Sequence, residues 1–96
     1  MEAQINAFMT YLHNVKHTSE NTELSYRRDL NKVKAYLEEQ GITEIGKVTS
    51  ENLTDYVEYM KKNQFSAATI SRNIASLKAF YHYLYQEGIV KEDAAD

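Results

Sequence analysis

The feature that most constrains this chain is the absence of proline from its 96 residues, together with a count of only three glycines. Proline breaks a helix because it lacks a backbone N–H and clashes with the preceding turn, and glycine inside a helix costs about 1 kcal/mol. Apolar residues recur every three or four positions through most of the chain, which is the spacing of amphipathic helices rather than of strands. We therefore expect an all-α protein.

Four helices are predicted from this spacing, over residues 2–16, 20–40, 51–63 and 67–87. A packed loop over residues 42–48 separates the second helix from the third. Each helix has one apolar stripe, and the stripes are expected to face a shared core. The stripe residues are Ile5, Phe8, Met9, Leu12 and Val15; Tyr26, Leu30, Val33 and Leu37; Leu53, Tyr56, Val57 and Met60; and Ile70, Ile74, Leu77, Tyr81 and Leu84.

Residues suited to helix ends flank these segments. A side-chain oxygen at a helix start accepts a hydrogen bond from a free backbone N–H, and a glycine often ends a helix in the left-handed conformation. The polar residues 91–96, after the last helix, are expected to be frayed. The expected N-cap residues are Thr18 or Ser19, Thr49 or Ser50, and Ser66, and the expected terminating glycines are Gly41 and Gly88.

The composition is that of one ordinary globular domain, with 43% hydrophobic and 26% charged residues. The absence of cysteine excludes disulfides, thiolate nucleophiles and cysteine metal sites, and it fits a cytoplasmic location. No apolar run approaches the roughly 18–20 residues that span a bilayer, so we expect no membrane partner.

Charge is distributed unevenly, although the formal net charge is −3. No acid occurs between Tyr59 and Gln86, a stretch that contains several basic residues. Such asymmetry predicts a face that binds an anion. The basic residues of this stretch are Lys61, Lys62, Arg72 and Lys78, with His82 as a further cation when protonated.

Catalytic and metal-binding patterns are few. His13 and His17 have the i, i+4 spacing that can bind a metal on one helix, but no third ligand is evident, and two solvated histidines explain them as well. No acid lies on an apolar stripe, where desolvation would raise its pKa. Neither a glycine-rich phosphate loop nor a Ser/His/Asp arrangement is present. We expect no metal, no cofactor and no catalysis by this chain alone.

The outer strip of the fourth predicted helix is the most informative surface. Thr69, Arg72 and Ser76 fall on this strip, followed by Ala79 and Tyr83. Small and hydroxylated residues around one arginine allow a helix to approach a nucleic-acid groove closely. Alternatively, the strip is a solvated face or packs on another domain. Asn73 lies beside the strip, and Ser66 and Ala67 lie at the helix start, where free N–H groups favour a phosphate.

The second predicted helix has a comparable side. Asn21, Ser25, Arg28 and Lys32 share it, with Arg27 on the shoulder. Here a merely solvated face is the stronger interpretation, because Asp29 and Glu20 lie nearby and basic residues on helix surfaces usually contact water.

Taken together in order, several runs resemble the tyrosine recombinases of the Xer and phage or transposon integrase type. Each run is a weak signal alone, but their order and spacing are specific. The resemblance extends from about Ile5 to Val90. The runs are Ser-Glu-Asn-Thr at 19–22, Tyr-Arg-Arg-Asp-Leu at 26–30, Gly41, Val48-Thr49 with Leu53, Ser-Ala-Ala-Thr-Ile-Ser-Arg at 66–72, Ser-Leu-Lys-Ala-Phe-Tyr-His-Tyr-Leu at 76–84, and Glu87-Gly88.

This resemblance implies a core-binding domain that is a four-helix SAM-like bundle of two crossed helical hairpins, as in lambda-integrase-like N-terminal domains. Residues 1–90 would be the DNA-binding domain, and residues 91–96 would begin a linker to a C-terminal catalytic domain absent from this chain. None of the eight tyrosines is then the nucleophile. The implied partners are double-stranded DNA at a recombination core site and other recombinase protomers in a synaptic complex, with no small-molecule substrate.

The resemblance also implies which residues bind DNA, since the second and fourth helices of the family face the major groove. The residues at these positions are Thr22, Ser25, Arg28, Ser66, Thr69, Arg72, Asn73 and Ser76. We accordingly expect Arg72→Ala to weaken DNA binding without lowering the melting temperature. Protomer contacts through the first helix would leave Phe8, Met9 or Leu12 less buried than their apolar character suggests.

The sequence departs from the family pattern at three places. Glu23 replaces an apolar residue, with Leu24 next to it on the exposed side, and Asn52 replaces an acid, which predicts a weakened capping box at the third helix. Residues 92–95 replace the usual Asn-Pro-Ala after the fourth helix. The rival hypothesis is a SAM-like or death-domain-like protein-interaction module, which self-associates or binds a protein and does not bind DNA.

Overall fold

The computed structural model describes all 96 residues. It contains four α-helices, one short 3-10 helix and no strand, so the predicted all-α class is confirmed. No helix combines the length and the hydropathy needed to cross a membrane. The elements in chain order are α1 (Glu2–Asn14), α2 (Glu20–Glu39), η1 (Ile45–Lys47), α3 (Ser50–Lys62) and α4 (Ala67–Gln86).

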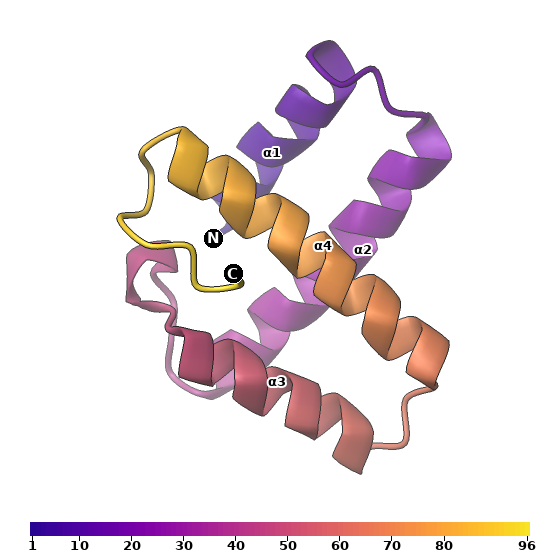
Figure 1. Ribbon diagram of the computed structural model, residues 1–96, viewed down its shortest axis with the longest axis vertical. Coiled ribbons are helices and arrows are strands. Elements are labelled where there is room, and N and C mark those ends of the chain that lie inside the picture. Colours follow the sequence, from indigo (N-terminus) through magenta and orange to yellow (C-terminus); the bar gives the residue numbers. More distant parts are fainter.

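The helices form two hairpins that cross. α1 and α2 run antiparallel and are joined by a short loop, and α3 and α4 form the second hairpin (Figure 1). In this view α4 lies across both α1 and α2, and it packs against all three other helices. The starts of α2 and α4 lie toward the same edge of the molecule, on the right of Figure 1. This placement brings the two polar helix faces of the sequence analysis to one side.

The core contains most of the predicted apolar stripes in a single cluster. Leu30, Tyr56, Met60 and Leu84 are completely buried, and Tyr26, Val57, Ile70 and Ile74 are half-buried at its edge. Val15 is the exception, because α1 ends at Asn14 and leaves Val15 61% exposed. The predicted helix over residues 2–16 is therefore too long by two residues.

Phe8, Met9 and Leu12 are buried in the core rather than exposed. They pack between α1 and the rest of the bundle, which is what their spacing dictates. The expectation that they remain partly free for contact with another protomer is therefore wrong.

The helix starts follow the predicted capping chemistry. Ser19, Thr49 and Ser66 are the N-cap residues, and each side-chain oxygen accepts a backbone N–H three residues on. The expectation of a weakened box at α3 is wrong, because the Asn52 Oδ1 accepts the Thr49 N–H at 2.9 Å. An amide oxygen replaces the carboxylate oxygen there. Gly41 follows the C-cap of α2 with φ of 81°, in the left-handed region.

His13 and His17 do not lie one turn apart on a single helix. α1 ends at Asn14, and His17 lies in the loop with a positive φ of 53°. No group of three or more His, Cys, Asp or Glu side chains is arranged to hold a metal ion.

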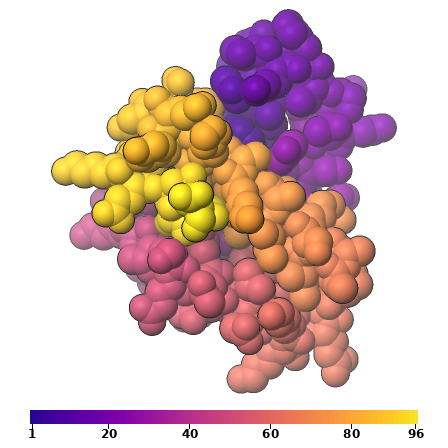
Figure 2. Space-filling view, viewed as in Figure 1, coloured from indigo at the N-terminus to yellow at the C-terminus, as the bar shows by residue number.

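The last residues fold back onto the bundle, so the expectation that residues 91–96 are frayed is wrong. The Ile89 N–H donates to the Leu84 carbonyl at 2.9 Å, which turns the chain at the end of α4. Val90 is buried, and Ala94 and Ala95 are half-buried against the core. Figure 2 shows this segment in yellow, covering the surface between α4 and the start of α3.

Candidate nucleic-acid interface

The crossing of α2 and α4 is held by an ion pair between Asp29 and Arg72. The Arg72 Nη2 lies 2.9 Å from the Asp29 Oδ1, and the Arg72 Nε lies 3.1 Å from the Oδ2. The hydrogen bonds from Arg72 to Asp29, followed by the charge of that carboxylate, raise the pKa of the guanidinium above its ordinary value. Asp29 is 2% exposed, so a charged pair, not an apolar contact, joins the two hairpins here.

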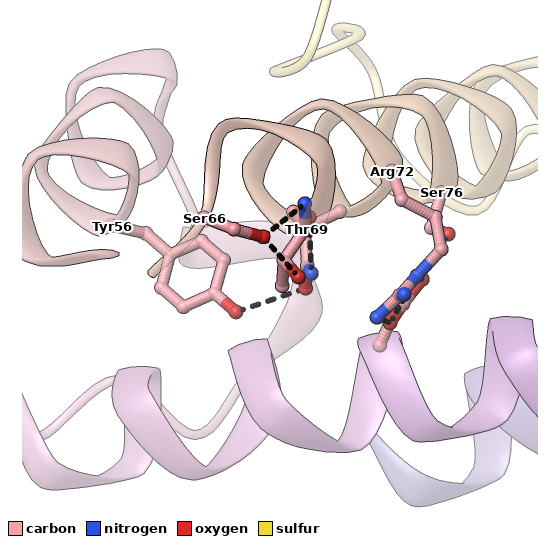
Figure 3. Close-up of polar contacts among 7 residues, drawn as sticks. Tyr56, Ser66, Thr69, Arg72 and Ser76 are labelled. Atoms are coloured by element: carbon pink, nitrogen blue, oxygen red, sulfur yellow. Dashed lines mark hydrogen bonds and ion pairs between the residues drawn. The ribbon is translucent and has the colours of Figure 1, made fainter. Parts of the chain in front are cut away.

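Further buried polar groups surround this pair. The Ser76 hydroxyl donates to the Asp29 Oδ2 at 2.8 Å. The Tyr56 hydroxyl of α3 donates to the Asn73 Oδ1 at 3.2 Å, and the Asn73 Nδ2 donates to the Thr69 carbonyl at 2.9 Å. Figure 3 shows Arg72 and Ser76 directed from α4 toward α2, with Tyr56 on the other side of Ser66 and Thr69. We use the name buried polar network for the ion pair and the side chains that bond to it or to one another beside it, which are Asp29, Tyr56, Arg72, Asn73 and Ser76.

Burial in this network raises the pKa of the Tyr56 hydroxyl, and the nearby charge of Asp29 raises it further. Tyr56 therefore stays protonated and able to donate to Asn73 throughout the physiological range.

The network corrects the sequence-based picture of α4. Asn73 is 1% exposed and Ser76 is 4% exposed: Ser76 is directed toward Asp29 of α2, and Asn73 is directed toward Tyr56 of α3. Ala79 is half-buried on the same strip, and Tyr83 packs against the ring of Tyr11 at 4.8 Å. The expectation that the strip is exposed from Thr69 to Tyr83 is therefore wrong for the residues after Arg72. Asn73 and Ser76 are too buried to contact a ligand at the surface.

Asp29 and Arg72 correct two further expectations. Asp29 is an acid inside the core, which the apolar pattern excluded. Arg72 supports the fold by neutralising it, so we no longer expect Arg72→Ala to leave the melting temperature unchanged. The Arg72 side chain is nevertheless 44% exposed, and its Nη1 makes no hydrogen bond within the chain.

The starts of α2 and α4 share one local structure. The Ser19 Oγ accepts the Thr22 N–H at 3.2 Å and its hydroxyl donates to the Thr22 Oγ1 at 2.9 Å. The Ser66 Oγ accepts the Thr69 N–H at 3.1 Å and donates to the Thr69 Oγ1 at 2.9 Å. Each Thr hydroxyl proton is then free to meet a ligand, since its oxygen accepts from the serine.

Cations lie between these two helix starts. Arg28 is exposed and makes no ion pair within the chain, whereas Arg27 is bound to Asn6 at 3.0 Å on the α1 side. Lys32 lies 4.9 Å over the ring of Phe65, just before α4 begins, which places it next to Ser66. Sequence reasoning placed Lys32 on this side of α2 but did not select it as a contact.

The accessible residues on this side form one surface, which we call the α2–α4 surface. Of the two acids in the first turn of α2, Glu20 is exposed, whereas Glu23 is directed toward α1 and the loop after it: its carboxylate accepts the Thr18 hydroxyl at 2.9 Å and lies 3.3 Å from the His13 Nδ1. Leu24 is exposed next to it, as predicted. The members of the surface are Thr22, Ser25, Arg28, Lys32, Ser66, Thr69 and Arg72.

Comparison with known proteins finds one matching family and several similar sequences. Residues 5–88 match the family described as phage integrase, N-terminal SAM-like domain. The chain is similar to the tyrosine recombinase XerC of Listeria innocua, with 36% identity over 86 residues, or 90% of this chain and 29% of that relative. It is also similar to the tyrosine recombinase XerC of Pseudomonas putida strain F1, with 34% identity over 95 residues, or 99% of this chain and 32% of that relative. The chain thus spans about a third or less of the length of these relatives.

Proposed function

Since this chain belongs to the family of phage integrase N-terminal SAM-like domains, we propose that it binds double-stranded DNA at a recombination core site. The proposed role is to hold the DNA for integration or recombination, which a C-terminal catalytic domain carries out in the cytoplasm. Residues 1–90 form the proposed DNA-binding domain, and residues 91–96 begin the proposed linker. Other recombinase protomers on the same DNA are the second class of proposed partner.

The observation that carries this proposal is the character of the α2–α4 surface. Two helices contribute cations to it, Arg28 and Lys32 from α2 and Arg72 from α4, and the acid at the crossing, Asp29, is buried and neutralised by Arg72. Hydroxyl groups of Thr22, Ser25, Ser66 and Thr69 lie around the cations. Cations neutralise phosphates, and hydroxyls and backbone N–H groups fix the register of a protein on the duplex.

The proposed contact set is narrower than the one expected from the sequence. It keeps Thr22, Ser25, Arg28, Ser66, Thr69 and Arg72 and adds Lys32. Burial removes Asn73 and Ser76 from direct contact and gives them a supporting part in the buried polar network. With so few cations, we expect a dissociation constant of about 10⁻⁴–10⁻⁶ M at physiological salt, the range of non-specific binding.

A titration of the isotope-labelled protein with a short duplex tests the proposal. We expect backbone amide shifts concentrated at residues 22–28 and 66–72. The shifts should be smaller at higher salt, because binding releases counterions from the DNA and added salt makes that release less favourable. The absence of shifts at low salt, with self-association of the protein instead, would favour the rival SAM-like or death-domain-like interaction module.

Arg28→Gln gives the matched test by substitution. Arg28 has no partner within the chain, so the melting temperature should stay the same while the slope of log affinity against log salt decreases by about 1. Lys47→Gln is the charge-matched control, because Lys47 is exposed in η1 beside Glu44, at the other end of α2. Equal effects of the two substitutions would mean that only net charge matters and would contradict the α2–α4 surface.

A further inference from the structure

We propose that Asp29 is a positioning residue for DNA binding, which holds the Arg72 guanidinium so that its free end is aimed at a DNA phosphate. This inference rests on the proposed function and concerns how one contact of the α2–α4 surface is formed. Asp29 itself is buried and touches no ligand. Its effect on binding is exerted through Arg72.

The geometry of the ion pair leaves a defined set of donors. A guanidinium has five N–H groups, and Asp29 takes its bonds from Nε and Nη2, one lateral edge of the group. One N–H of Nη1 and the outer N–H of Nη2 then form a second pair at the end of the side chain, and the other N–H of Nη1 is also left over. Such a pair matches two oxygens of a phosphate. Because 44% of the Arg72 side chain is exposed, this end can be reached from solvent.

Asp29 is itself fixed, which makes it a rigid support. It lies on α2 within the core, and its Oδ2 accepts both the Arg72 Nε and the Ser76 hydroxyl. The rotation of Arg72 is therefore already restricted in the free protein (Figure 3). A restricted donor loses less conformational entropy on binding, so its contact contributes more to affinity than that of a free side chain. Arg28, which makes no ion pair within the chain, lacks such a support.

The substitution Asp29→Asn distinguishes a positioning role of Asp29 from a simple effect of its charge, because the two predict opposite changes in DNA affinity. Asparagine keeps the size of the side chain but offers one acceptor oxygen in place of two, so the bidentate contact with Arg72 is lost. The substitution also raises the formal net charge by one, and charge alone would tighten binding to DNA. We expect binding to weaken by about tenfold, the effect of losing one well-aligned charged hydrogen bond.

Asp55→Asn is the matched control, because Asp55 is an exposed acid on α3 and its substitution changes the net charge equally. We expect it to leave binding unchanged or slightly tighter. Binding is measured by fluorescence anisotropy well below the melting temperature of each variant, and the amide spectrum confirms that the protein is folded. Unchanged or tighter DNA binding by folded Asp29→Asn would overturn the inference. The proposed function would still stand in that case, provided that the unaltered protein binds DNA.

A double-substitution cycle tests whether Asp29 acts through Arg72. Arg72→Met keeps much of the stem and removes the guanidinium, and Asp29→Asn in that background removes the buried unpaired charge. We expect the double variant to bind DNA as Arg72→Met does, with a higher melting temperature than Arg72→Met. A further tenfold loss in the double variant would show that Asp29 acts independently of Arg72 and would overturn the inference. No binding by the unaltered protein at low salt would overturn the proposed function and this inference together.

Discussion

The two sides of α4 are held to the bundle by different kinds of contact. Toward α1 the contact is aromatic: the ring of Phe8 lies 5.4 Å from that of Phe80 and 5.3 Å from that of Tyr83. Toward α2 the contact is the buried polar network, centred on Asp29 and Arg72. Apolar burial is non-directional and tolerates small shifts, whereas a bidentate ion pair fixes both the distance and the orientation of its partners.

This difference assigns the two sides different tasks. The aromatic side stabilises the position of α4 through burial, because large rings bury much apolar area. The polar side contributes less net stability, since desolvation of the ions offsets their attraction. It instead sets where the α2–α4 surface presents its cations and hydroxyls. Substitutions on the two sides should therefore separate stability from DNA binding.

The largest expected effect on stability is that of Phe8→Ala on the aromatic side. Loss of this buried ring should lower the free energy of unfolding by about 3–5 kcal/mol, measured by urea denaturation. The protein that remains folded at low temperature should bind DNA as the wild type does. Tyr85→Ala is the control, since Tyr85 is exposed and its loss should change stability by less than about 0.5 kcal/mol. Weaker DNA binding by folded Phe8→Ala would break the proposed separation.

A smaller effect on stability is expected when either of two buried tyrosines loses its hydroxyl, and the two tyrosines should differ. The Tyr56 hydroxyl donates to Asn73, whereas the buried Tyr81 hydroxyl has no hydrogen-bond partner in the chain. Tyr56→Phe should lower the free energy of unfolding by about 1–2 kcal/mol, because the Asn73 oxygen is left unpaired. Tyr81→Phe should leave stability unchanged or slightly higher. Thermal and urea unfolding of both variants measure the difference, and equal losses would contradict a special contribution from the network.

The smallest expected effect comes from an ion pair at the surface. The Lys34 Nζ donates to the Glu2 Oε2 at 2.8 Å, a contact that lowers the pKa of Glu2 below 4.5 and raises that of Lys34 above 10.5. The stabilisation from this ion pair is therefore fully present at pH values between the ordinary pKa values of the two groups, 4.5 for Glu2 and 10.5 for Lys34. It is lost as the pH falls through the lowered pKa of Glu2 or rises through the raised pKa of Lys34.

Glu2→Gln removes this ion pair and tests the pH dependence. At pH 7 it should lower the melting temperature by about 2 °C or less, because exposed pairs contribute little. The difference from wild type should shrink toward pH 3. If Glu2→Gln lowered the melting temperature at pH 7 as much as Tyr56→Phe does, the exposed ion pair would stabilise the protein as strongly as the buried hydrogen bond.

Much of the fold was predictable from the sequence, because apolar spacing and capping residues are local signals. They located four helices within one or two residues and identified most of the core. The resemblance supplied the crossing of the hairpins and the family, both of which are confirmed. DNA binding, and the residues that would make it, remain predictions.

The buried polar network was not predicted, because helical spacing was applied to apolar residues alone. Asp29 lies three residues after Tyr26 and four before Val33, so its position is a core position occupied by an acid. Asn73 and Ser76 likewise lie four residues before the buried Leu77 and Phe80, respectively. Their burial depends on α2 and α3 lying against α4, and contacts between separate helices are not contained in any local pattern. Two features together would have signalled the ion pair: an acid at a core position of one helix, Asp29, and an arginine on the polar strip of another helix, Arg72.

The crossing of the hairpins also governs the order in which this protein assembles. Each hairpin closes over a short loop, whereas Asp29 and Arg72 are 43 residues apart in the chain. Short loops close fast and with little entropy loss, so we expect each hairpin to form early and the crossing to form last. The α2–α4 surface takes one helix from each hairpin. Neither half of the chain therefore carries it alone, and the proposed DNA-binding surface is complete only after the final step of folding.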